Sequence, residues 1–138
     1  MRIVLDTNVL ISATFWTGAS FRILQLIEQG KATLVLSKQI LDEYDRIVHS
    51  DEILQKQAFQ QERKDAVLKI LQLAVLVEPK EHITAVKDDP DDNKFIEAAI
   101  AANATYIISQ DKKHLISLKE FRGIKIVTPE TFLSLLEK

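Results

Sequence analysis

Four carboxylates stand out in this sequence because of where they fall relative to apolar segments. Asp6 directly follows an apolar run at residues 3–5, and Asp111 follows a second run at residues 106–109. A lone carboxylate is costly to bury unless its charge is compensated, so Asp6 either reaches water at a strand end or has a cationic partner. If both runs are parallel strands, both acids lie beyond the carboxyl end of the sheet, where ligands bind in such folds.

A third acid, Glu43, is selected by its place on a predicted helix over residues 38–49. At about 100° per residue, Asp42 points away from the apolar stripe, whereas Glu43 and Asp45 flank it. Glu43 lies closer to the helix start and to the end of the preceding strand, which makes it the better candidate for a cleft, with Asp45 as the alternative. The apolar stripe consists of Ile40, Leu41, Tyr44, Ile47 and Val48.

The fourth acid, Asp92, lies in an acidic segment at the start of another predicted helix. Pro90 fits the first helical position and Asp89 the N-cap, which leaves Asp88 and Asp91 as surface charges favoured by the helix dipole. Asp92 falls near the middle of the buried arc and either bonds free backbone N–H groups or binds a ligand. That arc consists of Phe95, Ile96, Ala99 and Ile100.

Together these four acids predict a site for a hard cation. A cluster of carboxylates repels itself and raises its own pKa values, and a divalent cation with oxygen ligands relieves this, which suits Mg²⁺ or Mn²⁺. Zinc is disfavoured because the chain has no cysteine and its three histidines lack ligand spacing. Divalent cations held by acids commonly serve phosphoryl chemistry, which leads to the hypothesis of a nuclease.

The elements that must position these acids alternate between strand and helix, which predicts an α/β fold: helices on both faces of a central, mainly parallel sheet. Ser37 is the expected N-cap of the helix over 38–49, and Thr128 and Pro129 are expected to begin the last helix. A loop is expected at residues 15–18. Strands are expected at residues 2–5, 33–36, 75–77, 106–109 and 124–127, and other helices at 20–29, 51–74 (in two pieces) and 91–103.

Composition bounds the class of protein. The 138 residues suit one domain, 1–138, and the 46% hydrophobic and 28% charged residues are typical of a soluble chain. No signal-peptide pattern or membrane-length apolar run is present, so we expect a cytoplasmic protein that binds no membrane. The net charge of −2 argues against binding nucleic acid through a basic surface alone. Several basic residues cluster toward the C-terminal end, and we interpret them mainly as a solvent-exposed surface: Lys112, Lys113, His114, Lys119, Arg122 and Lys125.

Four segments, which together span nearly the whole chain, carry a resemblance to a known family. They are LDTNVLISA at 5–13, LVLSKQILDEYDRIV at 34–48, DPDDNKFIEAAIAANATYIISQDKKHL at 89–115 and GIKIVTPETFL at 123–133. With these segments the chain resembles the PIN domain family, and within it the VapC-like toxins of toxin–antitoxin pairs. The first and third segments are the most specific, whereas residues 50–80 carry little signature.

The resemblance implies a Rossmann-like three-layer α/β/α fold and an endoribonuclease that cleaves single-stranded RNA with Mg²⁺ or Mn²⁺. It implies a type II toxin, an antitoxin partner and a homodimer. It places the family's catalytic and metal-binding acids on Asp6, Glu43, Asp92 and Asp111, with Thr7 or Asn8 supporting Asp6 and Ser109 as the family's small hydroxyl residue.

One departure from the family pattern follows Asp111. The family often has a further Asp there, whereas this chain has Lys112, Lys113 and His114. His114 is a candidate proton carrier, although a solvent-facing side chain is the expectation.

Other functions fit the residues less well. A phosphatase of the haloacid dehalogenase type needs an acid two residues after Asp6, where this chain has Asn8, and a receiver module needs paired acids and a late lysine in places that are not apparent here. The alternative that stays open is a catalytically silent PIN-fold module that binds RNA or protein.

Trp16 could stack on a base, anchor a partner or pack against the first helix. The loop at Phe15 and Trp16 and the helices at 51–74 are candidate dimer surfaces.

Overall fold

The central element of the fold is a mainly parallel sheet. We describe the protein from a computed structural model that covers residues 1–16, 18–50, 61–111 and 113–137. Within these ranges six strands pair in the order β3-β2-β1-β4-β6-β5, and only the β5–β6 pair is antiparallel. The strands are β1 (Arg2–Leu5), β2 (Thr33–Ser37), β3 (Val75–Val77), β4 (Tyr106–Ile108), β5 (Glu120–Phe121) and β6 (Ile124–Val127).

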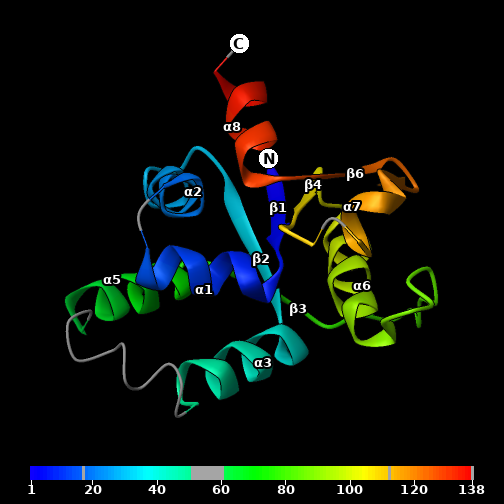
Figure 1. The fold of residues 1–138 in the computed structure, drawn as a ribbon, viewed down its shortest axis with the longest axis horizontal. Helices are drawn as coiled ribbons and strands as arrows, with labels where there is room; N and C mark the ends of the chain where they lie inside the picture. The colour runs from blue at the N-terminus through cyan, green and yellow to red at the C-terminus, as the bar shows by residue number, and fades with distance from the viewer. Residues whose placement is uncertain (17, 51–60, 112, 138) are drawn as a thin grey trace.

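Helices cover both faces of this sheet, so the predicted three-layer α/β/α architecture is confirmed. Helices α1, α2 and α5 contact one another on one side, and α6 packs against β1, β2 and β4 on the other (Figure 1). The helices are α1 (Thr7–Phe15), α2 (Ala19–Glu28), α3 (Lys38–Val48), α5 (Gln61–Leu71), α6 (Asn93–Ala102), α7 (Leu115–Leu118) and α8 (Pro129–Leu136). A short 3₁₀ turn, Pro90–Asp92, precedes α6.

Helix α1 is the main element that the sequence pattern failed to predict. Residues 7–15 are helical, and Phe15, expected in a loop, is the buried last residue of the helix. The pattern gave no signal because α1 is buried nearly all round, so it lacks the polar face that produces a helical period. Trp16 follows the helix with 48% of its surface exposed and meets the Phe15 ring edge to face at 6.1 Å.

The other predicted elements agree with the structure to within a few residues. Ser37 caps α3 by accepting a hydrogen bond from the Ile40 N–H at 3.3 Å, and Thr128 caps α8. The helix predicted over 91–103 corresponds to α6, which the 3₁₀ turn precedes. Asp89 lies at the N-cap and Pro90 at the first position of that turn, as predicted, although the Asp89 side chain makes no capping hydrogen bond. Helix α7 and strand β5 were not predicted because they are only four and two residues long, respectively. Of the predicted helical stretch 51–74, the second piece is α5, and residues 51–60 lie outside the described ranges.

The core joins the sheet to both helical layers. Buried side chains of β1, β2 and β4 meet Leu10 of α1, Ile23 of α2 and Phe95 of α6 in one cluster. In the described part of the chain, no single helix is long and apolar enough to cross a membrane, although α1 and α2 taken together pass that test of length and composition.

Candidate metal centre

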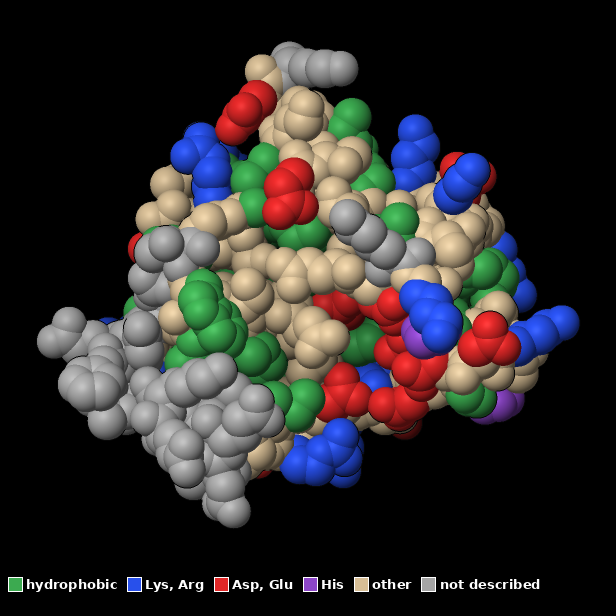
Figure 2. Space-filling view, in the orientation of Figure 1, with side chains coloured by type: hydrophobic (Ala, Val, Ile, Leu, Met, Phe, Trp, Pro, Cys, Tyr) green, Lys and Arg blue, Asp and Glu red, His purple; other side chains and the backbone are tan. Residues whose placement is uncertain are grey.

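The four predicted acids line one small cavity of about 40 Å³ at the carboxyl end of the sheet. They come from four segments: the end of β1, the middle of α3, the turn before α6 and the loop after β4. The chain reverses its direction of winding between the neighbouring strands β1 and β4, so loops diverge there and leave room for a ligand. Figure 2 shows Asp and Glu side chains gathered on this face with a His beside them. The cavity is also lined by Thr7, Asn8 and Phe95.

Asp6 is the most buried of these acids, with only 3% of its surface exposed. Its Oδ1 accepts a hydrogen bond from the Val9 N–H at 2.8 Å and so caps α1, and its Oδ2 accepts one from the Ser109 hydroxyl. Burial raises the pKa of Asp6, and the bonds from Ser109 and Val9 oppose that rise. Asp6 is therefore fixed in one orientation, and a nearby cation would favour its charged form.

Asp92 and Asp111 form a coupled pair across the cavity. Burial, the hydrogen bond with Asp111 and the charge of Asp89 raise the pKa of Asp92 to about 7. Burial also opposes ionisation of Asp111, but hydrogen bonds from His114 and Asp92 outweigh it and lower the pKa of Asp111. The pair thus shares one proton near neutral pH, as expected of two carboxyl groups with no cation between them.

Glu43 faces the cavity, as its place on α3 predicts, whereas Asp45 is exposed and lies 3.3 Å from His49. One oxygen of Glu43 already has a partner, because the ammonium of Lys94 lies 2.5 Å away. Sequence reasoning missed Lys94. Its acid neighbour three residues earlier, Asp91, was the available signal, since side chains at that spacing meet on a helix.

The residues expected to support Asp6 behave differently from one another. Ser109 donates to it, while the hydroxyl of Thr7 is buried with no hydrogen-bond partner in the described structure. Asn8 is exposed and lines the cavity. The orphaned Thr7 oxygen beside four carboxylates fits the ligand preference of a hard divalent cation, which takes hydroxyl, carboxylate and water oxygens.

His114 is not the solvent-facing side chain that the sequence suggested. Its side chain is only 21% exposed, and its Nδ1 lies 3.0 Å from Oδ2 of Asp111. Asp89, Asp92 and His114 also bring one ligand atom each within 4.8 Å of one another, which makes them a second arrangement that could hold a metal ion. Asp92 belongs to both arrangements. Lys112 lies outside the described residues.

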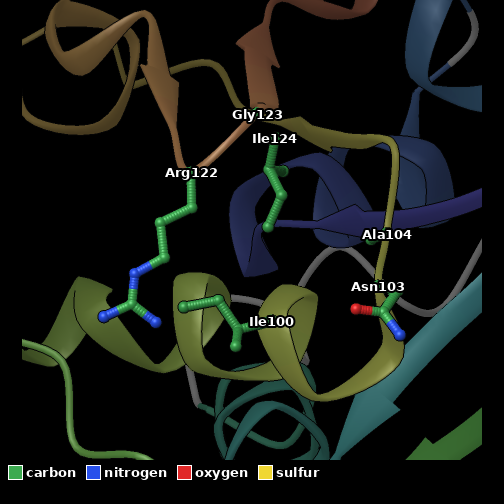
Figure 3. Close-up of a pocket in the computed structure, with 6 residues that line it drawn as sticks. All are labelled: Ile100, Asn103, Ala104, Arg122, Gly123 and Ile124. Atoms are coloured by element: carbon green, nitrogen blue, oxygen red, sulfur yellow. The ribbon is translucent and has the colours of Figure 1, made fainter.

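A larger hollow of about 360 Å³ lies away from the acids, between the end of α6 and the turn that joins β5 to β6. Figure 3 shows Arg122 extending from that turn toward α6, with Ile100 between it and Asn103 at the other side of the hollow. The guanidinium pairs with Glu81 at 2.6 Å, so its charge is already compensated. This hollow lacks the convergent charges of the acidic cavity.

The comparison with family models identifies the chain. The model described as PIN domain matches residues 2–113, which include all four acids. The chain belongs to the PIN domain family. No curated protein matches it at a significant level.

Two solved structures share the fold of this PIN domain at low sequence identity. One is VapBC2 from Rickettsia felis bound to a DNA fragment from its promoter, with 16% identity, a TM-score of 0.60 and coverage of 91% of this chain and 97% of that one. The other is PAE2754 from Pyrobaculum aerophilum, with 12% identity, a TM-score of 0.63 and coverage of 100% and 91%. At these identities the likeness shows the fold alone.

Proposed function

We propose that this PIN domain is an endoribonuclease that hydrolyses single-stranded RNA with the help of Mg²⁺ or Mn²⁺. The observation that carries the proposal is the convergence of Asp6, Glu43, Asp92 and Asp111 on one cavity from four separate segments. A structural role for such a cluster is a poor explanation, because like charges brought together destabilise the fold unless a cation compensates them. Membership of the PIN domain family supports the same conclusion.

In this proposal Asp6, Asp92 and Asp111 hold the cation, and Glu43 closes the α3 side of the cavity. A bound divalent cation supplies activation of water and neutralisation of charge on the phosphate. Ser109 and the start of α1 hold Asp6 in place, so the carboxylate needs no rearrangement to bind. His114 holds Asp111 in the same way through its ring nitrogen.

We also propose the biological setting that the family resemblance suggests: a toxin that acts in the cytoplasm as a homodimer and is neutralised by a protein antitoxin. The structural likeness to VapBC2 is compatible with this setting. The partner test is co-purification with the product of a neighbouring reading frame.

The test of the activity is cleavage of a labelled single-stranded RNA with Mg²⁺, with Mn²⁺ and with a chelator. The wild type should cleave only with a divalent cation, and Asp6→Asn or Asp92→Asn should reduce the rate by at least about a hundredfold, the scale of removing one electrostatic contribution to transition-state stabilisation. Asp42→Asn is the matched control, since Asp42 is an exposed acid paired with Lys38 on α3.

Full activity in either site variant would contradict the proposed site. RNA binding without cleavage under every divalent cation would favour the silent RNA-binding module instead.

A further inference from the structure

Lys94 is a nearly buried lysine in the wall of the acidic cavity, with 9% of its side chain exposed. Its ammonium donates to Glu43 Oε2 at 2.5 Å, to Asp91 Oδ2 at 2.7 Å and to the Asp91 carbonyl at 3.1 Å. These three acceptors satisfy the three N–H donors of an ammonium group. Lys94 therefore ties α3 to the turn that carries Asp92.

This lysine lies where its charged form is favoured. Two carboxylate oxygens, from Glu43 and Asp91, lie 2.5 and 2.7 Å from its ammonium nitrogen. The ammonium also lies 4.9 Å from the centre of the Phe95 ring, and Phe95 lines the cavity. A fixed positive charge thus stands beside the place where a cation would bind.

The position of that charge conflicts with the use of Glu43 as a full metal ligand. Glu43 lines the cavity, yet its Oε2 contacts Lys94 and lies 3.9 Å from Arg46. A divalent cation that took this oxygen would have to displace the ammonium or share the carboxylate with it. Either event costs binding free energy, because two cations then compete for one anion.

We propose that Lys94 is a positioning residue that acts as a built-in counterion: it holds Glu43 against α6 and competes with the divalent cation for that carboxylate. This inference rests on the proposed function, since it concerns the same cavity. It makes Asp6, Asp92 and Asp111 the principal ligands and leaves Glu43 as a partner of Lys94. Lys94 thereby keeps the affinity of the site for divalent cations low.

The test is a calorimetric titration with Mn²⁺ of the wild type and of Lys94→Gln, with folding checked by circular dichroism. Removal of the ammonium should tighten Mn²⁺ binding about tenfold, the scale expected when a carboxylate oxygen that Lys94 occupied is freed to face a divalent ion in a partly solvated site. Lys38→Gln is the control because it removes the same charge from an exposed pair on α3, and it should stay within about twofold of wild type. Unchanged or weaker binding by Lys94→Gln would overturn the proposal.

A double-mutant cycle separates competition for Glu43 from a general change in charge. In the Glu43→Gln background, the added change Lys94→Gln should alter Mn²⁺ affinity by no more than about twofold. A gain as large as in the wild-type background would overturn the role assigned to Glu43. Lys94→Arg keeps the charge and should bind Mn²⁺ within about twofold of wild type. If Lys94→Gln fails to fold, Lys94→Met, which keeps the length of the side chain and removes its charge, takes its place in both comparisons with the same expected and contradicting results.

Failure of the proposed function gives a different result. Equal Mn²⁺ binding by the wild type and Asp6→Asn would reject the metal site, whatever the Lys94 variants do. If the wild type binds no Mn²⁺ but Lys94→Gln does, the competition is supported in its strongest form. If neither binds, both proposals are overturned.

Discussion

Replacement of Asp92 by Asn should stabilise the metal-free protein at neutral pH and abolish its stabilisation by divalent cations. In the folded chain, the pKa of Asp92 is raised from 3.8 to about 7, mainly by burial and by the Asp111 carboxyl group. A group whose folded pKa is raised contributes full stability below its unfolded pKa, and this contribution is lost as the pH rises through the folded value. For Asp92 that window runs from about pH 4 to about pH 7. The Asn side chain has nearly the same shape as that of Asp92 but is never ionised, so it avoids the cost of a buried negative charge.

The gain in unfolding free energy of Asp92→Asn follows from the shift in the pKa of Asp92. One pKa unit corresponds to about 1.4 kcal/mol, so the full shift would give about 4 kcal/mol. Asp92 is partly exposed, and its proton is shared with Asp111, so solvent screening and coupling reduce the expected value to about 1 to 2 kcal/mol. The gain should be close to zero at pH 4 and reach this value at about pH 7.5.

The assay is urea unfolding of the wild type and Asp92→Asn with a chelator at both pH values, with Asp42→Asn as the exposed control. Mn²⁺ at about a hundred times its dissociation constant should then stabilise the wild type by about 2.7 kcal/mol and leave Asp92→Asn nearly unchanged. The electrostatic reasoning is refuted if the variant is no more stable than wild type at pH 7.5, or if its gain is the same at both pH values.

Three further substitutions test the contacts that position the site. Ser109→Ala should cost about 1 to 3 kcal/mol of unfolding free energy, since it removes a hydrogen bond from the buried Asp6, and RNA cleavage should fall with it; wild-type stability by urea unfolding would contradict this. Asn93→Ala should cost about 2 to 3 kcal/mol, because its side chain bonds both the N–H and the carbonyl of Val86, and faster hydrogen exchange at Val86 should accompany the loss. Tyr44→Phe should cost about 1 to 2 kcal/mol in thermal unfolding, since its hydroxyl shares a 2.9 Å hydrogen bond with a buried threonine of α1; an unchanged melting temperature would speak against it.

The sequence was sufficient to predict the sheet because its strands are short apolar runs bounded by polar residues. Five of the six strands in the described ranges follow from such runs, and the parallel arrangement follows from the helices between them. The exception, β5, is only two residues long, and its antiparallel pairing depends on a turn with positive φ at Arg122 and Gly123. A run that short leaves no period for a pattern to detect.

The proximity of the four acids could be predicted for a related reason. Asp6 and Asp111 follow strands that pair directly, with Leu5 opposite Ile108, so their proximity follows from topology. Asp92 was selected because it falls on the buried arc of a predicted helix, where an acid needs either free backbone N–H groups or a ligand. Whether these residues bind metal and cleave RNA stays a prediction.

The contacts of Lys94 and His114 could not be predicted in the same way. Each depends on the three-dimensional separation of loops and helices, and a lysine or histidine in a polar segment usually reaches water. Lys94 is buried because α6 packs against the sheet and the turn Pro90–Asp92 contacts α6. At this place its ammonium contacts Glu43, which belongs to helix α3. The spacing of three residues between Asp91 and Lys94 marks one of these contacts in the sequence, but the contact with Glu43 is a property of the fold and leaves no periodic mark.

The most direct measurement is the anomalous scattering of Mn²⁺ in a crystal of the wild-type protein. We predict a peak in the cavity with carboxylate oxygens of Asp6, Asp92 and Asp111 at roughly 2.0 to 2.6 Å, the range for hard cations and oxygen ligands. A peak held by Asp89, Asp92 and His114 without Asp6, or no peak at these carboxylates, would contradict the account.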